Sequence, residues 1–156
     1  MNSADKRILT ELQRNADQSL ESLGERIGLS RNACWNRIKR LEDSGHIRGR
    51  VALLDPNKVN LGLMVFIAVR TNQHDPDWLD RFASATQTLP EIIGVFRTSG
   101  DLDYLIQARV PDVAAYDLLY QRLIKKVPLA DVSASFVMQE IKQTTELPLT
   151  YALSSN

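Results

Sequence analysis

Residues 29 to 47, LSRNACWNRIKRLEDSGHI, form the stretch that decides the fold. Ser30 is of a type that caps a helix N-terminus, and Gly45 is suited to end the helix. One apolar stripe is formed by Ala33, Cys34, Ile38 and Leu41. The other faces mix cations, amides and an aromatic ring: Arg31, Asn32, Trp35, Asn36, Arg37, Lys39 and Arg40. The pattern predicts a helix that packs on one face and meets a nucleic-acid groove with the other.

Two shorter amphipathic stretches precede this helix. The first spans Ser3 to Arg14, and the second begins at Ser19 and ends before the Gly28-Leu29 turn. Three helices, the last two joined by a tight turn, predict a helix-turn-helix with its last helix in the DNA major groove. A three-helix bundle for protein contacts is the alternative.

The segment after this helix predicts a wing. Ile47 to Leu53 is expected to continue as a hairpin that brings Arg48 and Arg50 to the DNA backbone. The DNA-binding residues expected in total are Ser19, Ser30, Arg31, Asn32, Trp35, Asn36, Arg37, Lys39, Arg40, Arg48 and Arg50.

The overall charge hides a difference between the two parts of the chain. The sequence has 19 Lys and Arg and 19 Asp and Glu, so its net charge is zero. Residues 1 to 50 hold ten basic and seven acidic side chains, a net charge of +3, which leaves −3 for the remainder. A basic first part on an acidic second part favours a regulator that binds DNA at one end.

Length and composition indicate where in the cell the protein is located. The 156 residues, 44% of them hydrophobic, contain no run of about 18 uncharged apolar residues that could span a membrane. Residues 1 to 14 are too charged for a secretory signal, so we expect a cytoplasmic protein. The single cysteine, Cys34, lies on the inward stripe and is expected to be a small buried residue rather than a redox sensor.

A second domain follows the boundary at Leu54 to Lys58. The sequence predicts strands at 62–70, 92–98, 103–110 and 130–142, and helices at 76–89 and from 111 onward. Side chains expected to face inward from these helices are Trp78, Leu79, Phe82, Ala83, Leu89, Val113, Tyr116, Leu119, Tyr120, Leu123 and Val127. The order βαββαβ predicts a ferredoxin-like fold, so the chain is α+β. The domains expected are 1–50, a linker strand 51–60, the ferredoxin-like domain 61–142 and a tail 143–156.

The first strand of this domain is apolar on both faces. Met64, Phe66 and Ala68 alternate with an equally apolar set, so the face without helices would be exposed. Pairing with an identical sheet would cover it. We therefore expect a homodimer, which also places two DNA-reading helices for a pseudo-palindromic site.

Three stretches resemble the Lrp/AsnC family of transcription regulators: DKRILTELQRNADQSLESLGERIGLSRNACWNRIKRLEDSGHI, the linker VALLDPNKVNLG, and SGDLDYLIQARVPDVAAYDLL with a following VMQEIK. The resemblance spans nearly the whole chain. It implies a winged helix-turn-helix, a ligand-sensing ferredoxin-like domain, dimers that assemble into octamers or higher species, and an amino acid as effector.

The resemblance also implies where the effector binds, between dimers near the 98–103 turn and the last strand. The residues at those positions are Thr98, Ser99, Gly100, Asp101, Asp103, Tyr104, Ala134, Ser135, Phe136 and Val137. Asp101 or Asp103 could pair with the effector's ammonium group, while hydroxyl and turn N–H groups meet its carboxylate. The alternative is that Gly100-Asp101 only makes a good turn.

The sequence gives little support for an enzyme. His46 and His74 fall in separate loops with no Cys or Ser partner nearby. No Cys or His spacing typical of a metal site occurs, although Asp101, Asp103 and Asp112 could contribute oxygen ligands. We therefore expect that the protein is not an enzyme and that it binds no metal. We also expect no cofactor other than the effector. A DNA-coating architectural protein without an effector is the closest rival to a regulator.

Overall fold

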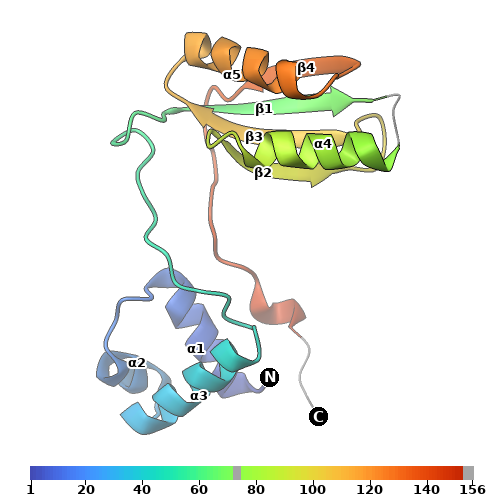
Figure 1. Ribbon diagram of the computed structural model, residues 1–156. Coiled ribbons are helices and arrows are strands. Elements are labelled where there is room, and N and C mark those ends of the chain that lie inside the picture. Colours follow the sequence, from blue (N-terminus) through green and yellow to red (C-terminus); the bar gives the residue numbers. More distant parts are fainter. Residues whose placement is uncertain (72–74, 153–156) are drawn as a thin grey trace. The chain divides into compact units, whose positions relative to one another are not determined.

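The computed structural model describes residues 1–71 and 75–152. It divides into two compact units (Figure 1). The helical unit comprises Met1–Ala52 together with the C-terminal residues from Lys142, and the sheet unit comprises Leu53–Ile141.

Three helices form the helical unit: α1 (Ser3–Arg14), α2 (Leu20–Ile27) and α3 (Arg31–Asp43). Side-chain caps start all three, since Asn2, Ser19 and Ser30 each accept a backbone N–H of the first turn. The core joins all three helices through Ile8, Leu9, Leu23, Ile27, Cys34, Ile38 and Leu41. The predicted helices and the buried position of the cysteine are confirmed.

The turn between α2 and α3 depends on two glycines. Gly28 has φ +70°, in the left-handed region that glycine adopts readily, and ends α2. A Cβ on Gly24 would lie 2.4 Å from the carbonyl oxygen of Leu29. A side chain at Gly24 would therefore push the turn away from α2 and tilt the start of α3.

The predicted hairpin after α3 does not form. Residues 44–62 contain no strand, and Val51, Leu53 and Leu54 are exposed. Both the wing at 47–53 and the linker strand at 51–60 are extended or turn segments here. A strand needs a hydrogen-bonded neighbour, and no described segment of the chain pairs with this one.

The sheet unit has the predicted ferredoxin-like order. It contains β1 (Leu63–Arg70), α4 (Pro76–Gln87), β2 (Ile92–Arg97), β3 (Tyr104–Val110), α5 (Val113–Lys126) and β4 (Asp131–Phe136). The strands lie in the order β2-β3-β1-β4, and all neighbours are antiparallel. Both helices pack on the face formed by Val65, Ile67 and Val69, which are fully buried (Figure 1).

Three details of the sheet unit differ from prediction. The last strand ends at Phe136 rather than at 142. The N–H of Val137 still bonds to the carbonyl of Met64, but β1 begins at Leu63 and so offers no partner to the residues that follow. Leu79 and Val113 were predicted to face inward but are 41% and 57% exposed. The inward stripe of α4 runs through Trp78, Phe82 and Ala85, which places the neighbouring Leu79 off the stripe, and Leu89 joins the same core just after the helix ends.

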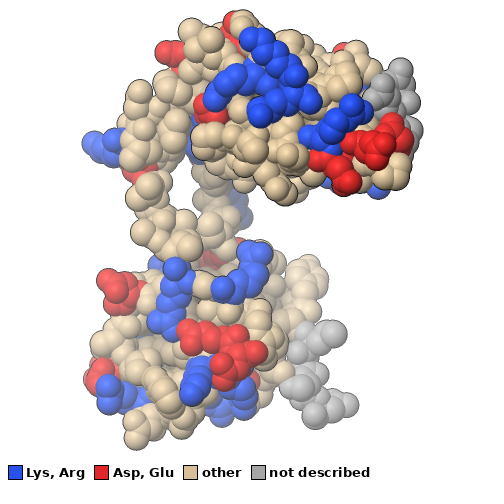
Figure 2. All heavy atoms as spheres, viewed as in Figure 1, with Lys and Arg blue, Asp and Glu red and all other residues tan. Residues whose placement is uncertain are grey.

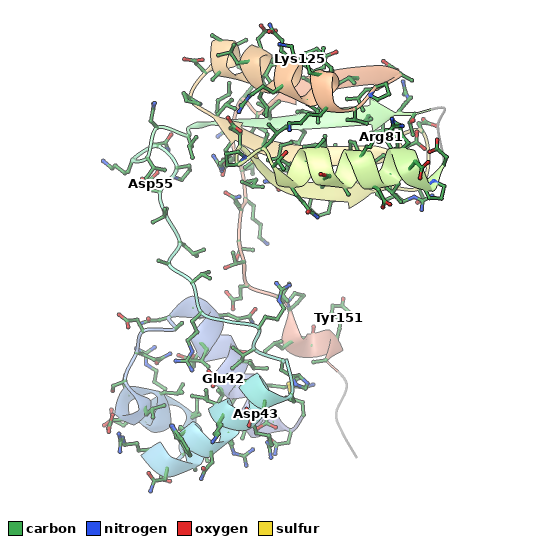
Figure 3. The ribbon with its side chains drawn as sticks, in the orientation of Figure 1. Glu42, Asp43, Asp55, Arg81, Lys125 and Tyr151 are labelled. Carbon is green, nitrogen blue, oxygen red and sulfur yellow. The ribbon has the colours of Figure 1, made fainter. Side chains whose placement is uncertain are left out.

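The C-terminal segment packs on α1, which the sequence did not indicate. Gln13 exchanges two hydrogen bonds with the backbone of Leu147, at 2.6 and 3.2 Å. Arg14 pairs with Glu146 at 3.1 Å. The short 3-10 helix η1 (Leu149–Tyr151), marked by Tyr151 in Figure 3, adds Leu149 to the helical core. The helical unit is thus built from both ends of the chain.

Candidate nucleic-acid interface and effector site

The faces of α3 are divided as predicted. Cys34, Ile38 and Leu41 are buried, whereas the side chains expected to meet DNA are exposed, with one exception. The exception is Arg37, whose side chain is only 28% exposed.

Arg37 is held at α1 by a buried carboxylate. Asp5, in the first turn of α1, accepts hydrogen bonds from Arg37 at 2.8 Å and from Arg40 at 2.9 and 3.0 Å. It also accepts the N–H of Asn2 at 3.0 Å. Burial by itself raises the pKa of Asp5, but the Asn2 hydrogen bond and the two guanidinium groups outweigh it and hold the pKa below its usual value.

Other basic side chains of the helical unit also face acidic partners. Arg31 pairs with Glu21 at 2.7 Å, and Arg50 pairs with Glu42 at 2.8 Å. On the face of the helical unit that Figure 2 shows, acidic and basic side chains are interspersed. Exposed pairs of this kind are weak and can be exchanged for phosphate contacts.

The remaining polar face of α3 is not engaged by acids. Within the described residues, Lys39 has no ion pair, and Asn32 and Asn36 have no side-chain hydrogen bond to a carboxylate. The ammonium group of Lys39 lies 5.3 Å from the ring centroid of Trp35, a cation–π contact across one helical turn.

The two serines expected at DNA are helix caps. Ser19 accepts the N–H of Ser22, and Ser30 accepts the N–H of Ala33. Each hydroxyl retains a proton that can be donated to a phosphate, and helix N-termini favour anions. Capping and phosphate contact are therefore compatible at both positions.

The turn expected to bind the effector is held by its own hydrogen bonds. The N–H of Thr98 donates to the carbonyl of Asp103 at 2.9 Å, and Gly100 has φ +111°. The carboxylate of Asp103 accepts the N–H of Thr71 at 2.8 Å. In contrast, Arg70 donates to the backbone carbonyl of Asp101 and to the carboxylate of Asp131, and no described residue donates to the Asp101 carboxylate.

The other expected effector residues are divided between two faces of the sheet. Tyr104 is buried against Trp78 and Phe82, and Ala134 and Phe136 pack on the same core. Ser135 lies on the opposite face, because it is the register partner of Phe66.

The turn and the far end of the last strand also lie toward different ends of β1. The strand β1 pairs Val69 with Tyr104 beside the turn, and Val65 with Phe136. These β1 positions are about 13 Å apart at the usual rise of a strand. The turn and Phe136 therefore do not meet around one small ligand within one chain.

Few alternative sites are present in the described residues. A shallow hollow of about 420 Å³ is lined by Asp80, Arg81, Ser84, Ala85 and Lys126, none of them an expected effector residue. No group of three His, Cys, Asp or Glu side chains in residues 1–71 and 75–152 could hold a metal ion. No helix in those residues is long and apolar enough to cross a membrane. His46 hydrogen bonds to Ser44, and His74 lies outside the described residues.

Comparison with known proteins supports both halves of the chain. Residues 1–48 match the family described as winged helix-turn-helix DNA-binding, and residues 64–147 match the Lrp/AsnC ligand binding domain. The chain is 47% identical over 145 residues to the glutamate uptake regulatory protein of Zymomonas mobilis, covering 93% of this chain and 88% of that one. It is 43% identical over 150 residues to the DNA-binding transcriptional activator DecR of Escherichia coli, covering 96% and 99%.

A solved structure agrees with both units. A transcriptional regulator of Neisseria meningitidis, crystallised as an L-Met complex, superposes with a TM-score of 0.92 at 38% identity and covers 98% of this chain and 99% of that one. A helix-turn-helix with a solvent-facing last helix, joined to a ligand-binding domain, defines a DNA-binding transcription regulator. The chain belongs to the Lrp/AsnC family, as the sequence resemblance implied, and its relatives named here are regulators of transcription.

Proposed function

We propose that this protein binds specific duplex DNA through the outward face of α3 and that an amino acid bound by the sheet unit changes that binding. The observation that carries the proposal is the division of α3 into a buried apolar stripe and an exposed face of amide, aromatic and basic side chains. The α2–α3 turn, fixed by Gly24 and Gly28, presents that face in the manner of a recognition helix.

The amino-acid effector is supported by a relative and by the turn at 98–103. The Neisseria regulator was crystallised with L-Met. In this chain the Asp101 carboxylate is available for an ammonium group, while Asp103 supports the turn. Because the turn and Phe136 are separated along β1, the site is expected to be completed by a second dimer.

Dimer formation is supported by the helix-free face of the sheet. On this face, one row of register partners crosses all four strands: Phe96, Leu105, Ala68 and Ser133. Phe96 is 52% exposed, and its ring lies over Gly94, where an added Cβ would sit 2.8 Å from it. Pairing two such faces removes apolar surface from water, and four or more dimers joined by effector sites would give an octamer or a higher assembly. A cytoplasmic location follows from DNA as the partner.

The test has two parts. Full-length protein is incubated with a random duplex library, bound sequences are selected, and their affinities are measured by fluorescence anisotropy at fixed salt. Selective affinity supports a regulator, and uniform affinity contradicts sequence-specific binding. A thermal-shift screen with the twenty amino acids then identifies the effector, and that amino acid is expected to change the DNA affinity. If no amino acid does so, the protein is better described as an architectural DNA-binding protein.

A further inference from the structure

The arginines of α3 are engaged within the helical unit. Arginine bound to guanine is the commonest specific contact in a major groove. Here Arg37 and Arg40 share the carboxylate of Asp5, and Arg31 pairs with Glu21. The exposed side chains of α3 that no acidic residue engages, within the described residues, are Asn32, Trp35, Asn36 and Lys39.

The side chain of Trp35 is more exposed than a purely structural role would require. It is the one large hydrophobic side chain exposed on residues 1–43, all of which the structure describes, and it is 51% exposed. The helical core is complete without it, since Cys34, Ile38 and Leu41 supply the inward stripe. Its ring is steadied on the polar face by Lys39, four residues later.

The chemistry of the major groove offers one apolar partner for this ring. Thymine presents a C5-methyl group beside its O4 acceptor, and no other base carries a methyl group on its major-groove edge. The indole of Trp35 has an apolar face and one N–H donor, which match the methyl group and O4.

We propose that Trp35 is the specificity-determining residue of α3 and that it recognises the C5-methyl group of a thymine. This inference rests on the proposed function, because it requires α3 to enter the major groove. It goes further by assigning one base contact to one side chain. The competing explanation, that Trp35 contacts a protein, is an outcome of the test.

The experiment combines a protein variant with a change of one methyl group in the DNA. The best duplex from the library selection is synthesised with deoxyuridine in place of each thymine in turn, which removes only the C5-methyl group. Anisotropy titrations at fixed salt compare wild type, Trp35→Ala and Trp35→Gln. Leu118→Ala is the control, because Leu118 is an exposed apolar residue on α5.

One thymine position is expected to lose about fourfold in wild-type affinity when its methyl group is removed, the value of one buried methyl group. That loss should vanish in Trp35→Ala and Trp35→Gln and persist in Leu118→Ala. A deoxyuridine penalty that persists without Trp35, or selective binding with no such penalty, overturns the inference and leaves the proposed function standing. If the wild type selects no sequence, both fail. If Trp35→Ala changes only the assembly state, Trp35 contacts protein and the inference is overturned.

Discussion

The carboxylate of Asp5 on α1 and the guanidinium group of Arg37 on α3 are joined by a hydrogen bond of 2.8 Å. Asp5 is buried, and Arg37 is the least exposed of the basic side chains paired on α3. The bond therefore fixes the recognition helix against the first helix. Arg37 acts through this contact, and its effect on DNA binding is expected to follow from the position of α3.

Arg37→Ala is expected to lower the free energy of unfolding of the helical unit by about 1–3 kcal/mol, because a buried carboxylate loses a charged donor while Arg40 remains. Hydrogen exchange of the α1 and α3 amides in the full chain measures this. Arg26→Ala removes an exposed pair with Glu11 and serves as the control, with an expected change within about 0.5 kcal/mol. Exchange as slow in Arg37→Ala as in wild type would show that the bond contributes nothing.

The same carboxylate makes the helical unit sensitive to acid. The folded-state pKa of Asp5 is lowered from the ordinary 3.8, so its contribution is fully present above pH 3.8 and is lost as pH falls below that value through the folded pKa. Circular dichroism against pH is expected to show a shallower acid dependence for Asp5→Asn than for wild type. Asp101→Asn, at a carboxylate that no described residue engages, is the control and should follow wild type. Parallel curves for wild type and Asp5→Asn would contradict the assignment.

The helices depend on local features of the sequence and were predicted well. Contacts between residues far apart in the sequence were not predicted. The Ser19 and Ser30 caps act within four residues, so they can be read from the chain. The Asp5–Arg37 bond joins residues 32 apart, and the Gln13–Leu147 contact joins residues 134 apart. The one local feature that involves Asp5 is the capping box with Asn2, which orients the start of α1 but does not indicate the bond to Arg37.

The candidate effector site shows the same limit. The turn at 98–103 was predictable from Gly100, whose φ of +111° suits glycine. The burial of Tyr104 was not, because it depends on which face of β3 meets the helices, and Tyr104 shares that face with Ile106. The residues assigned by resemblance thus included some that serve the core.

The C-terminal segment is expected to stabilise the DNA-binding unit. A chain that ends at Thr144 loses the two Gln13–Leu147 hydrogen bonds, the Arg14–Glu146 pair and the packing of Leu149. We expect its helical unit to unfold more easily by about 1–3 kcal/mol, measured by calorimetry of the truncated chain. A chain that ends at Ala152 keeps these contacts and is the matched control. Equal transition temperatures for the two chains would assign the segment no role in stability.

The helix-free sheet face is expected to be the dimer interface. Phe96→Asp places a charge on the edge strand β2, at one end of the row that Phe96 forms with Leu105, Ala68 and Ser133, and the cost of burying an unpaired charge should shift the full chain from dimer or larger species to monomer. Sedimentation velocity measures the species. Leu118→Asp, which adds the same charge at an exposed site on α5, should leave the assembly unchanged. An unaltered Phe96→Asp assembly would move the interface elsewhere.

Two aspartates of the 98–103 turn are expected to separate ligand binding from turn stability. The Asp101 carboxylate has no donor among the described residues, so Asp101→Ala should remove a charged contact to the effector's ammonium group and weaken binding about ten- to hundredfold. Asp103→Ala removes the acceptor of the Thr71 N–H and should lower stability as well. Calorimetric titration with the amino acid found in the thermal-shift screen, paired with thermal unfolding, measures both quantities. Because neither residue belongs to α3, DNA affinity without effector should stay within about twofold of wild type in Asp101→Ala. Wild-type effector affinity in Asp101→Ala would assign the turn a structural role and place the effector elsewhere in the assembly.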